Sequence, residues 1–432
     1  MSALVLLAGT IVLHAACLRF FPKAELDPWG LSDFYPLSVF LFRRPAAWQA
    51  LLGLAELGAF AWAWPRLERE SSLARIFVAG LVLAVASNLL LGWRYGIDYP
   101  TTGWGDGGIE YYQDAILVKG PLWLLQRFNA VQFDLLEHAR THPPGPVLLY
   151  WALHLLLRDP GLVSIGVTAV FLGLVLDPLR RLLRQVYHEE PVGALLLFCA
   201  LPASLIYGLA TVDAVIAGLF LRTVAAFVEP RGRLSSIRAA FWLALSLFFT
   251  FGALFLLPVL SGFELFRRRS LRRSLSVLAG ACVALGALKV LTGFDWAAAF
   301  LKASAMENEK GFLLLADPRR YGWYRIGAVA EILFYFTPFL CLLAWRGRAA
   351  LKAASEDGWV LAWLGPATLA AMLLSGAMKV GEAARICIFI VPFLLLPAMA
   401  AFKDLDAAGR RRVAMMVFGW GTAMQLFGFY QW

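Results

Sequence analysis

Three acidic residues follow one another at four-residue spacing in a glycine-rich part of the sequence. Asp106 lies within the segment 103–108, Glu110 follows four residues later, and Asp114 follows four residues after that. Glycine lets a backbone approach a ligand closely and adopt positive φ, and this spacing would place the carboxylates on one face of a helix. The pattern indicates either a charged face in contact with solvent or a polar site in which a carboxylate removes a proton from a hydroxyl group.

Aromatic side chains and a histidine accompany these acids. Tyr111 and Tyr112 directly follow Glu110, and their rings could stack on a sugar or anchor the chain at the boundary of a membrane. His142 precedes Pro143, and a residue before proline is held in an extended conformation. The ring of His142 can then point back toward the acids and bind a phosphate, or it can cap the helix that follows.

Charged residues within apolar segments complete the set of candidates. Lys289 and Arg385 each lie near one end of an apolar segment, where a buried cation needs a charged partner or an anionic ligand such as a phosphate. Glu382 precedes Arg385 by three residues, a spacing at which it could be a purely structural partner. Asp213 lies near the end of another apolar segment.

The composition of the chain indicates which solvent these residues meet. Of the 432 residues, 60% are hydrophobic and only 16% are charged, and the mean hydropathy is +0.70. A soluble domain of this size needs more polar residues to cover its core, so the sequence predicts a membrane protein. The net charge of +10 comes from Lys and Arg in short loops, which is typical of cytoplasmic loops and predicts no nucleic acid partner.

Apolar segments recur along the whole chain. A helix needs about 20 residues to cross a bilayer, and the segments predict an all-α, polytopic helical protein of about 13 transmembrane helices. We expect it to form a single domain over residues 1–432. The first segment lacks a basic stretch before it and a cleavage site after it, so we expect it to be retained. The expected spans are residues 3–17, 48–64, 73–93, 162–179, 192–207, 212–228, 239–249, 252–266, 277–291, 326–345, 359–374, 384–401 and 415–429.

Lys and Arg fall on alternate sides when these spans are counted in order. The clusters that share one face are assigned to the cytoplasm by the positive-inside rule. Two long loops, residues 94–160 and 292–325, then lie outside, and long loops of this kind usually carry function. The clusters on the cytoplasmic face begin at Arg66, Arg180, Arg231, Arg267, Arg346 and Lys403.

Three details follow from this topology. Residues 143–157 must form an interfacial or re-entrant juxtamembrane helix, because a full crossing would place the cluster at Arg180 outside. Prolines at the start of this segment suit the first turn of a helix. The basic residues between 319 and 325 close the second loop, where they could meet lipid head groups or form a belt at the membrane boundary. Glu331 is an acid within a span and could be an interhelical hydrogen-bond partner.

The first long loop has a recognisable pattern at both ends. It opens with YPTTGWGDGGIEYYQDA, residues 99–115, and closes with THPPGPVLLYW, residues 141–151. This arrangement resembles the GT-C superfamily of integral membrane glycosyltransferases, in particular the branch with bacterial aminoarabinose transferase and the protein O-mannosyltransferases. In that family an acid followed by a tyrosine-containing helix opens the first external loop, and a His- or Lys-Pro-Pro element closes it. Asp106 matches the acid, and His142 with the two prolines after it matches the closing element.

The resemblance extends more weakly into later segments. Residues 202–213, in which a proline and a tyrosine precede Asp213, and residues 381–392, which contain Arg385, continue it. The departure is in the first loop, because the acids of the family are adjacent, whereas here three residues separate Asp106 from Glu110.

The resemblance implies an inverting glycosyltransferase that moves a sugar from a polyprenyl-phosphate carrier to a hydroxyl group of a lipid, glycan or protein acceptor. It would work in the cell envelope, at the outer face of a bacterial or archaeal plasma membrane. Asp106 would be the general base, with Glu110 as a second catalytic acid. These two could also hold a divalent cation, as in some relatives, although two carboxylates make an incomplete site and other relatives work without metal. The residues expected to bind substrate are Tyr111, Tyr112, His142, Asp213, Lys289 and Arg385.

Two other functions fit parts of the same pattern. A transporter or flippase of a lipid-linked saccharide would use the same charges, but it should carry them near the middle of the membrane on broken helices and show repeat symmetry. The sequence has no repeat of fixed period. A non-catalytic membrane scaffold is the third reading, and it requires Asp106 and His142 to lie far apart. The five cysteines lie in apolar runs without a CxxC pair, so we expect small core residues.

Overall fold

The structure is a computed structural model that describes residues 40–103, 111–230, 232–307, 311–376 and 383–430. In these ranges the chain is almost entirely helical, and its strands form one short antiparallel pair, β1 (Phe40–Phe42) with β2 (Gly428–Tyr430). The all-α class predicted from the sequence is therefore confirmed. The α-helices are α3 (Ala47–Leu67), α4 (Leu73–Leu89), α5 (Tyr99–Thr102), α6 (Tyr111–Leu117), α7 (Pro121–Val131), α8 (Glu137–Arg140), α9 (Gly145–Leu157), α10 (Pro160–Tyr187), α11 (Val192–Ala200), α12 (Val212–Val228), α13 (Arg233–Phe249), α14 (Leu256–Arg268), α15 (Arg272–Thr292), α16 (Trp296–Glu307), α17 (Leu313–Ala316), α18 (Pro318–Phe336), α19 (Pro338–Ala354), α20 (Glu356–Leu374), α21 (Ala383–Ile386), α22 (Val391–Lys403) and α23 (Ala407–Phe427).

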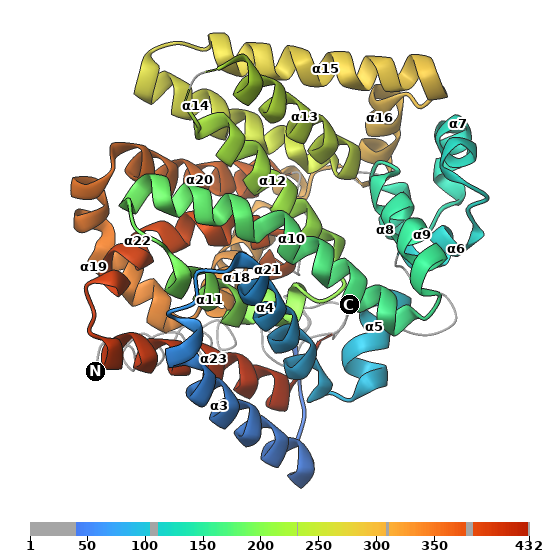
Figure 1. Ribbon diagram of the computed structural model, residues 1–432. Coiled ribbons are helices and arrows are strands. Elements are labelled where there is room, and N and C mark those ends of the chain that lie inside the picture. The colour runs from blue at the N-terminus through green and yellow to red at the C-terminus, as the bar shows by residue number, and fades with distance from the viewer. Residues whose placement is uncertain (1–39, 104–110, 231, 308–310, 377–382, 431–432) are drawn as a thin grey trace.

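Helix α12 is the centre of the core. It coincides with the span expected at residues 212–228, and its N-cap Thr211 accepts a hydrogen bond from the backbone of Ala214 at 3.3 Å. Asp213 and Arg222 are the two residues of α12 that are not buried. A helix that is apolar all round must be surrounded by other helices, and α12 packs between α10 and α13 (Figure 1).

Prolines break segments that were expected to be continuous. Residues 326–345 were expected to form one span, but they belong to α18 and α19, which meet at an angle of 91°. Thr337 lies at the break with a φ of +76°, and Pro338 after it disfavours helical geometry at the preceding residue. The segments expected at 192–207 and 384–401 are also broken, and each contains a proline close to the break.

The second long loop of the sequence analysis, residues 292–325, is largely helical. It contains α16, α17 and the first two turns of α18. Arg325 therefore lies within α18 and not at the end of a loop, with 7% of its surface exposed, and its guanidinium lies 4.7 Å from the ring centroid of Tyr321. The expectation that Arg325 meets lipid head groups is wrong, because the helix turns this side chain into the core.

The turns that carry the Lys and Arg clusters, here called the basic turns, lie at the end of the molecule where α12 ends. Arg181 at the end of α10 lies 3.5 Å from Glu229, which directly follows α12, and the Glu229 carbonyl accepts a hydrogen bond from Arg273 at 3.0 Å. Arg410 at the start of α23 lies 2.5 Å from Glu68, which directly follows α3. These contacts join turns that the positive-inside rule assigns to one face. Asp213 lies at the other end of α12, about 24 Å away at 1.5 Å per helical residue.

Three of the described helices, α10, α15 and α20, are long and apolar enough to cross a membrane, or four spans if the bent pair α18 and α19 counts as one. The expected number of about 13 crossings is not reached by this criterion, because several expected spans are short or broken and the first, residues 3–17, lies outside the described residues. Helix α15 is the clearest case, since Val283, Val290 and Leu291 are 72%, 86% and 78% exposed. Such an exposed apolar surface suits lipid better than water.

Candidate functional site

Helix α9 begins immediately after the His-Pro-Pro element, as the sequence predicts. Its first residue, Gly145, lies against the end of α13, where a Cβ atom would come within 2.5 Å of the Phe248 carbonyl oxygen. Only glycine permits this close approach. The contact fixes the start of α9 and therefore the position of His142, three residues earlier.

The two tyrosines at the start of α6 pack against α9. The ring of Tyr111 lies parallel to that of Tyr150, with centroids 6.2 Å apart, and meets the ring of His142 edge-on at 5.6 Å. The hydroxyl of Tyr112 is 2.9 Å from Nδ1 of His154. The structure thus brings Tyr111 and His142 together, whereas the hydroxyl of Tyr112 contacts His154, one turn beyond Tyr150 along α9.

The hydrogen bonds of His142 define how its ring can act. Nδ1 lies 3.0 Å from the carbonyl oxygen of His138. A carbonyl oxygen can only accept a hydrogen bond, so Nδ1 carries the proton. In the neutral ring, Nε2 then has the free electron pair and can accept a proton or a hydrogen bond from a ligand.

Opposing electrostatic effects act on the same histidine. Burial lowers the pKa of His142, the negative charges of Asp213 and Glu307 act to raise it, and His138 contributes in both directions. Burial is the largest of these causes, so the neutral form is favoured. The interaction with Asp213 also places His142 within electrostatic range of the start of α12.

Asp213 and Arg385 form an ion pair between α12 and α21. Nε of Arg385 lies 3.4 Å from Oδ2 of Asp213. Arg385 is 7% exposed, and Asp213 lies in the first turn of α12, where the helix dipole stabilises a carboxylate. The sequence analysis placed both residues in one binding site with His142, and the ion pair brings these two together. Glu382, the other candidate partner of Arg385, lies outside the described residues.

A buried acid on α18 fixes the segment that carries Arg385. Glu331 on α18 is 1% exposed, and its carboxylate oxygens accept hydrogen bonds from the backbone N–H groups of Ala383 and Ala384 at 3.3 Å each. Glu331 is thus the interhelical hydrogen-bond partner that its position in a span led us to expect. It orders the short helix α21 and so holds the guanidinium of Arg385 near Asp213.

Lys289 lies apart from this group. Its ammonium is 2.5 Å from Oδ2 of Asp295, and the hydrogen bond from Lys289 is the main cause that lowers the pKa of Asp295. Helix α16 follows and ends at Glu307, whose charge acts on His142. The 12 residues of α16 span about 18 Å, so Lys289 lies at the far end of this helix from the histidine.

The acids of the first loop are described only in part. Asp106 and Glu110 lie outside the described residues, so their expected roles as catalytic acids and as metal ligands stay predictions. Asp114 is buried, and its carboxylate accepts a hydrogen bond from the backbone of Leu136 at 3.0 Å. Burial raises the pKa of Asp114, and the hydrogen bond from Leu136 opposes this. Asp114 is therefore not part of a solvated face.

Sequence reasoning missed two residues of the site. Glu307 was treated as part of a long loop, and Tyr150 as one apolar residue among others. The ring of Tyr150 supports Tyr111, and its hydroxyl donates to the Ala210 carbonyl just before α12. Its spacing of four residues from Pro146 and three from Val147 is the signal that could have marked it as part of the inner face of α9.

Neither a metal cluster nor a disulfide is found in the part of the chain that the structure describes. That part has no group of three His, Cys, Asp or Glu side chains placed to hold a metal ion. Its cysteines, Cys199, Cys282, Cys341 and Cys387, are free thiols.

The sequence matches no protein-family model, and no curated protein matches it. The function must therefore be argued from the residues of the site.

Proposed function

We propose that the protein is a GT-C type glycosyltransferase, which moves a sugar from a polyprenyl-phosphate carrier to an acceptor hydroxyl at the outer face of a membrane. One observation carries this proposal: the rings of Tyr111 and His142 are in contact, and the charge of Asp213, which pairs with Arg385, acts on His142, although these residues come from three distant parts of the sequence. They combine an aromatic ring, a proton acceptor and a buried cation, which are the groups that a phosphate-linked sugar needs.

Each group has a role in a balanced transfer reaction. The bond between the anomeric carbon of the sugar and the phosphate oxygen breaks, and the phosphate leaves with the electron pair. The acceptor oxygen forms the new bond to that carbon, and its proton passes to the proposed base, Asp106. Arg385 stabilises the departing phosphate, because the planar guanidinium can donate two parallel hydrogen bonds to phosphate oxygens. His142 offers Nε2 to a sugar or acceptor hydroxyl.

The charge distribution supports an outward-facing site. The basic turns gather around Arg181, Arg273 and Arg410 at one end of the helices, and lipid-exposed cytoplasmic ends are rich in such residues. Asp213 lies about 24 Å away along α12. This separation is close to the hydrocarbon thickness of a bilayer, about 30 Å, and it would place the proposed site at the opposite, outer surface.

A transporter or flippase of a lipid-linked saccharide is the second candidate. It is favoured by the broken helices around Arg385, namely the short α21 before α22 and the 91° bend between α18 and α19. Discontinuous helices of this kind form the binding sites of many transporters. Both candidates bind the same lipid-linked sugar, and they differ in whether the bond to the phosphate breaks.

One reconstitution experiment separates the two functions. Proteoliposomes that contain the protein receive a polyprenyl-phosphate sugar with radiolabel in the sugar, together with a membrane extract as the source of acceptor. A transferase moves the label to a product that no longer extracts with the polyprenyl lipid. A flippase leaves the labelled lipid intact and changes the leaflet from which an added periodate reagent can reach the sugar.

Variants connect the result to the site. We expect Asp106→Asn and Arg385→Gln to reduce label transfer by about 100-fold or more, as for the loss of a general base or of a group that stabilises charge. Arg348→Gln is the matched control, because Arg348 lies on the cation-rich end of α19, stacked on Trp345. Equal transfer by the wild type, Asp106→Asn and Arg385→Gln would remove the proposed function.

A further inference from the structure

A large groove lies on the basic side of the molecule, far from the proposed site. Its volume is about 1110 Å³, and it runs between α19 and α23, with Ala61 of α3 at one edge. Most of its lining is apolar and includes Phe339 and Leu342 of α19 and Met416 of α23. The volume exceeds that of a pocket for a drug-sized molecule, about 300–1,000 Å³.

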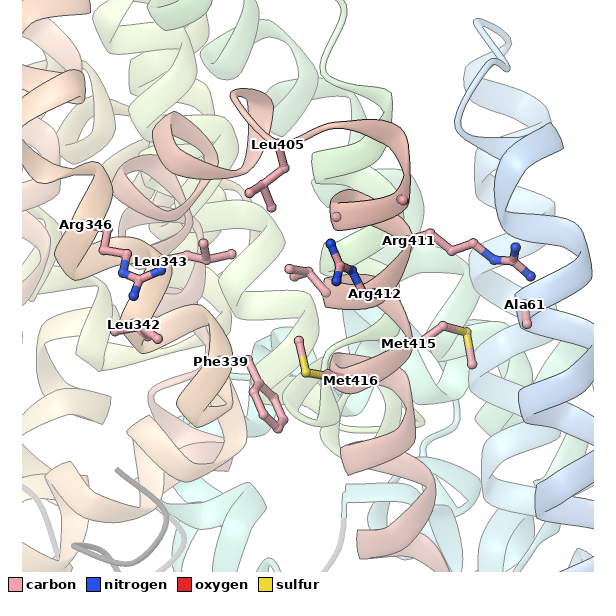
Figure 2. A pocket seen from close by; sticks show the side chains of 13 residues that line it. Ala61, Phe339, Leu342, Leu343, Arg346, Leu405, Arg411, Arg412, Met415 and Met416 are labelled. Atoms are coloured by element: carbon pink, nitrogen blue, oxygen red, sulfur yellow. The ribbon is translucent and has the colours of Figure 1, made fainter. Parts of the chain in front are cut away.

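Arginine side chains supply the polar part of this groove. Arg346 comes from α19, and Arg411 and Arg412 come from the first turns of α23. Figure 2 shows the guanidinium groups of Arg346 and Arg412 directed into the space between the two helices, whereas Arg411 points toward α3. The residues that line the groove include no acid.

Two arginines beside the groove, Arg410 and Arg348, have partners among the described residues. Arg410 is paired with Glu68 at 2.5 Å, and the Arg348 guanidinium lies 3.7 Å from the centroid of the Trp345 ring. Among the described residues, Arg346 and Arg412 have neither an ion-pair partner nor a hydrogen-bond partner. Two like charges that face one gap repel each other, so an anion between them is stabilised.

We propose that this groove binds one anionic phospholipid of the cytoplasmic leaflet, with its phosphate between Arg346 and Arg412 and an acyl chain along the apolar wall. The arginine end lies among the basic turns, where a cytoplasmic surface and its anionic lipids are expected. The apolar wall, lined by Phe339, Leu342 and Met416, continues from there toward the middle of the helices (Figure 2). The proposal rests on a membrane location but not on sugar transfer.

The other occupant to consider is the N-terminal segment of the chain, residues 1–39, which lies outside the described residues. Its first 18 residues contain no acid, and the acids that follow, Glu25, Asp27 and Asp33, fall between the first two expected spans, on the side opposite the basic turns. The segment could therefore cover the groove without neutralising its arginines. The charge of the lining therefore favours a lipid phosphate. The two occupants are separated by experiment.

Lipid retention tests the proposal. The full-length protein is placed in nanodiscs of equal parts phosphatidylglycerol and phosphatidylcholine, extracted in mild detergent, and its retained lipid is measured by native mass spectrometry. We expect the wild type to retain one phosphatidylglycerol and the double variant Arg346→Gln/Arg412→Gln to retain at least about tenfold less, since the loss of two charge-assisted hydrogen bonds exceeds 1.4 kcal/mol. The control Arg269→Gln/Arg272→Gln removes the same charge from exposed positions at the start of α15 and just before it and should behave as the wild type.

Two further measurements keep the proposal open to refutation. With p-benzoylphenylalanine in place of Phe339, light should attach an acyl chain, and a cross-link to a peptide from residues 1–39 would show that the chain itself fills the groove. Inorganic phosphate should not protect the wild type from thermal unfolding as well as phosphatidylglycerol does. Equal protection would mean a site for a free anion, and equal lipid retention by both double variants would mean that bulk charge alone attracts the lipid.

Discussion

The ion pair between Asp213 and Arg385 yields the sharpest prediction, because its two members should differ in what they do. Asp213→Asn removes the carboxylate charge that lies 3.4 Å from the buried Arg385. Breaking a fully buried pair costs about 3–5 kcal/mol. The Asp213 side chain is 22% exposed and the separation is 3.4 Å, so we expect a smaller loss of unfolding free energy, about 2 kcal/mol.

The double variant Asp213→Asn/Arg385→Gln removes both charges and should recover most of that stability. The coupling energy of the double-mutant cycle should therefore exceed about 1 kcal/mol. Sugar transfer should behave differently: both variants that lack Arg385 should stay inactive, whereas Asp213→Asn keeps part of the activity. Thermal unfolding of the detergent-solubilised protein and label transfer by the same samples give the two readouts. Full transfer by the double variant would refute the role of Arg385 as a phosphate ligand, and additive stability effects would refute the ion pair.

Three further predictions follow from other contacts. Burial lowers the pKa of His142, so the contribution of this residue to stability is complete above the unfolded pKa of about 6.5 and is lost as the pH falls toward the folded pKa. Between pH 7.5 and pH 5, the unfolding temperature of the wild type should therefore fall more steeply than that of His142→Asn. Equal slopes for the two proteins would contradict this. Tyr112→Phe removes the hydroxyl that lies 2.9 Å from His154 and should cost about 1 kcal/mol of stability with little loss of transfer, whereas a large loss of transfer at unchanged stability would mean that the hydroxyl contacts substrate. Gly347→Ala would place a Cβ atom 1.9 Å from a backbone oxygen of α22 and should destabilise the protein by about 1–3 kcal/mol. The control Gly173→Ala should be tolerated, because open space surrounds this glycine. Equal unfolding temperatures of the two variants would show that α19 and α22 are not packed this closely.

Hydropathy located most helices, because a helix surrounded by lipid and a helix surrounded by other helices are both rich in apolar residues. The expected segment 212–228 coincides with α12, and the segment expected to start at 143 forms α9 from Gly145. The breaks were missed although their cause stands in the sequence. Apolar residues continue across Pro338, so hydropathy averaged over a window does not detect the break. The break arises because Pro338 has no backbone N–H and restricts the conformation of Thr337 before it.

The partners in the site were harder to predict than its members. Arg385 was expected to need an acid, and the nearest acid in sequence was Glu382, but the described contact is with Asp213 on another helix. Local spacing predicts partners on one helix, whereas a pair between helices depends on how the helices pack. Asp114 illustrates the same limit, because its burial beside Leu136 depends on the chain returning past α6 after α7.

The fold itself suggests why the site would tolerate a charged substrate beside an apolar core. Both carboxylate oxygens of Glu331 accept hydrogen bonds from backbone N–H groups at the start of α21, so these contacts order the short helix through its backbone and not through the Arg385 side chain. Asp213 is likewise supported by the first turn of α12, and its carboxylate lies 3.4 Å from Nε of Arg385. If Arg385 binds a phosphate as proposed, the hydrogen bonds from Ala383 and Ala384 to Glu331 keep its backbone in place. In the proposed reaction, Glu331 would therefore position α21, and Arg385 would bind the lipid phosphate.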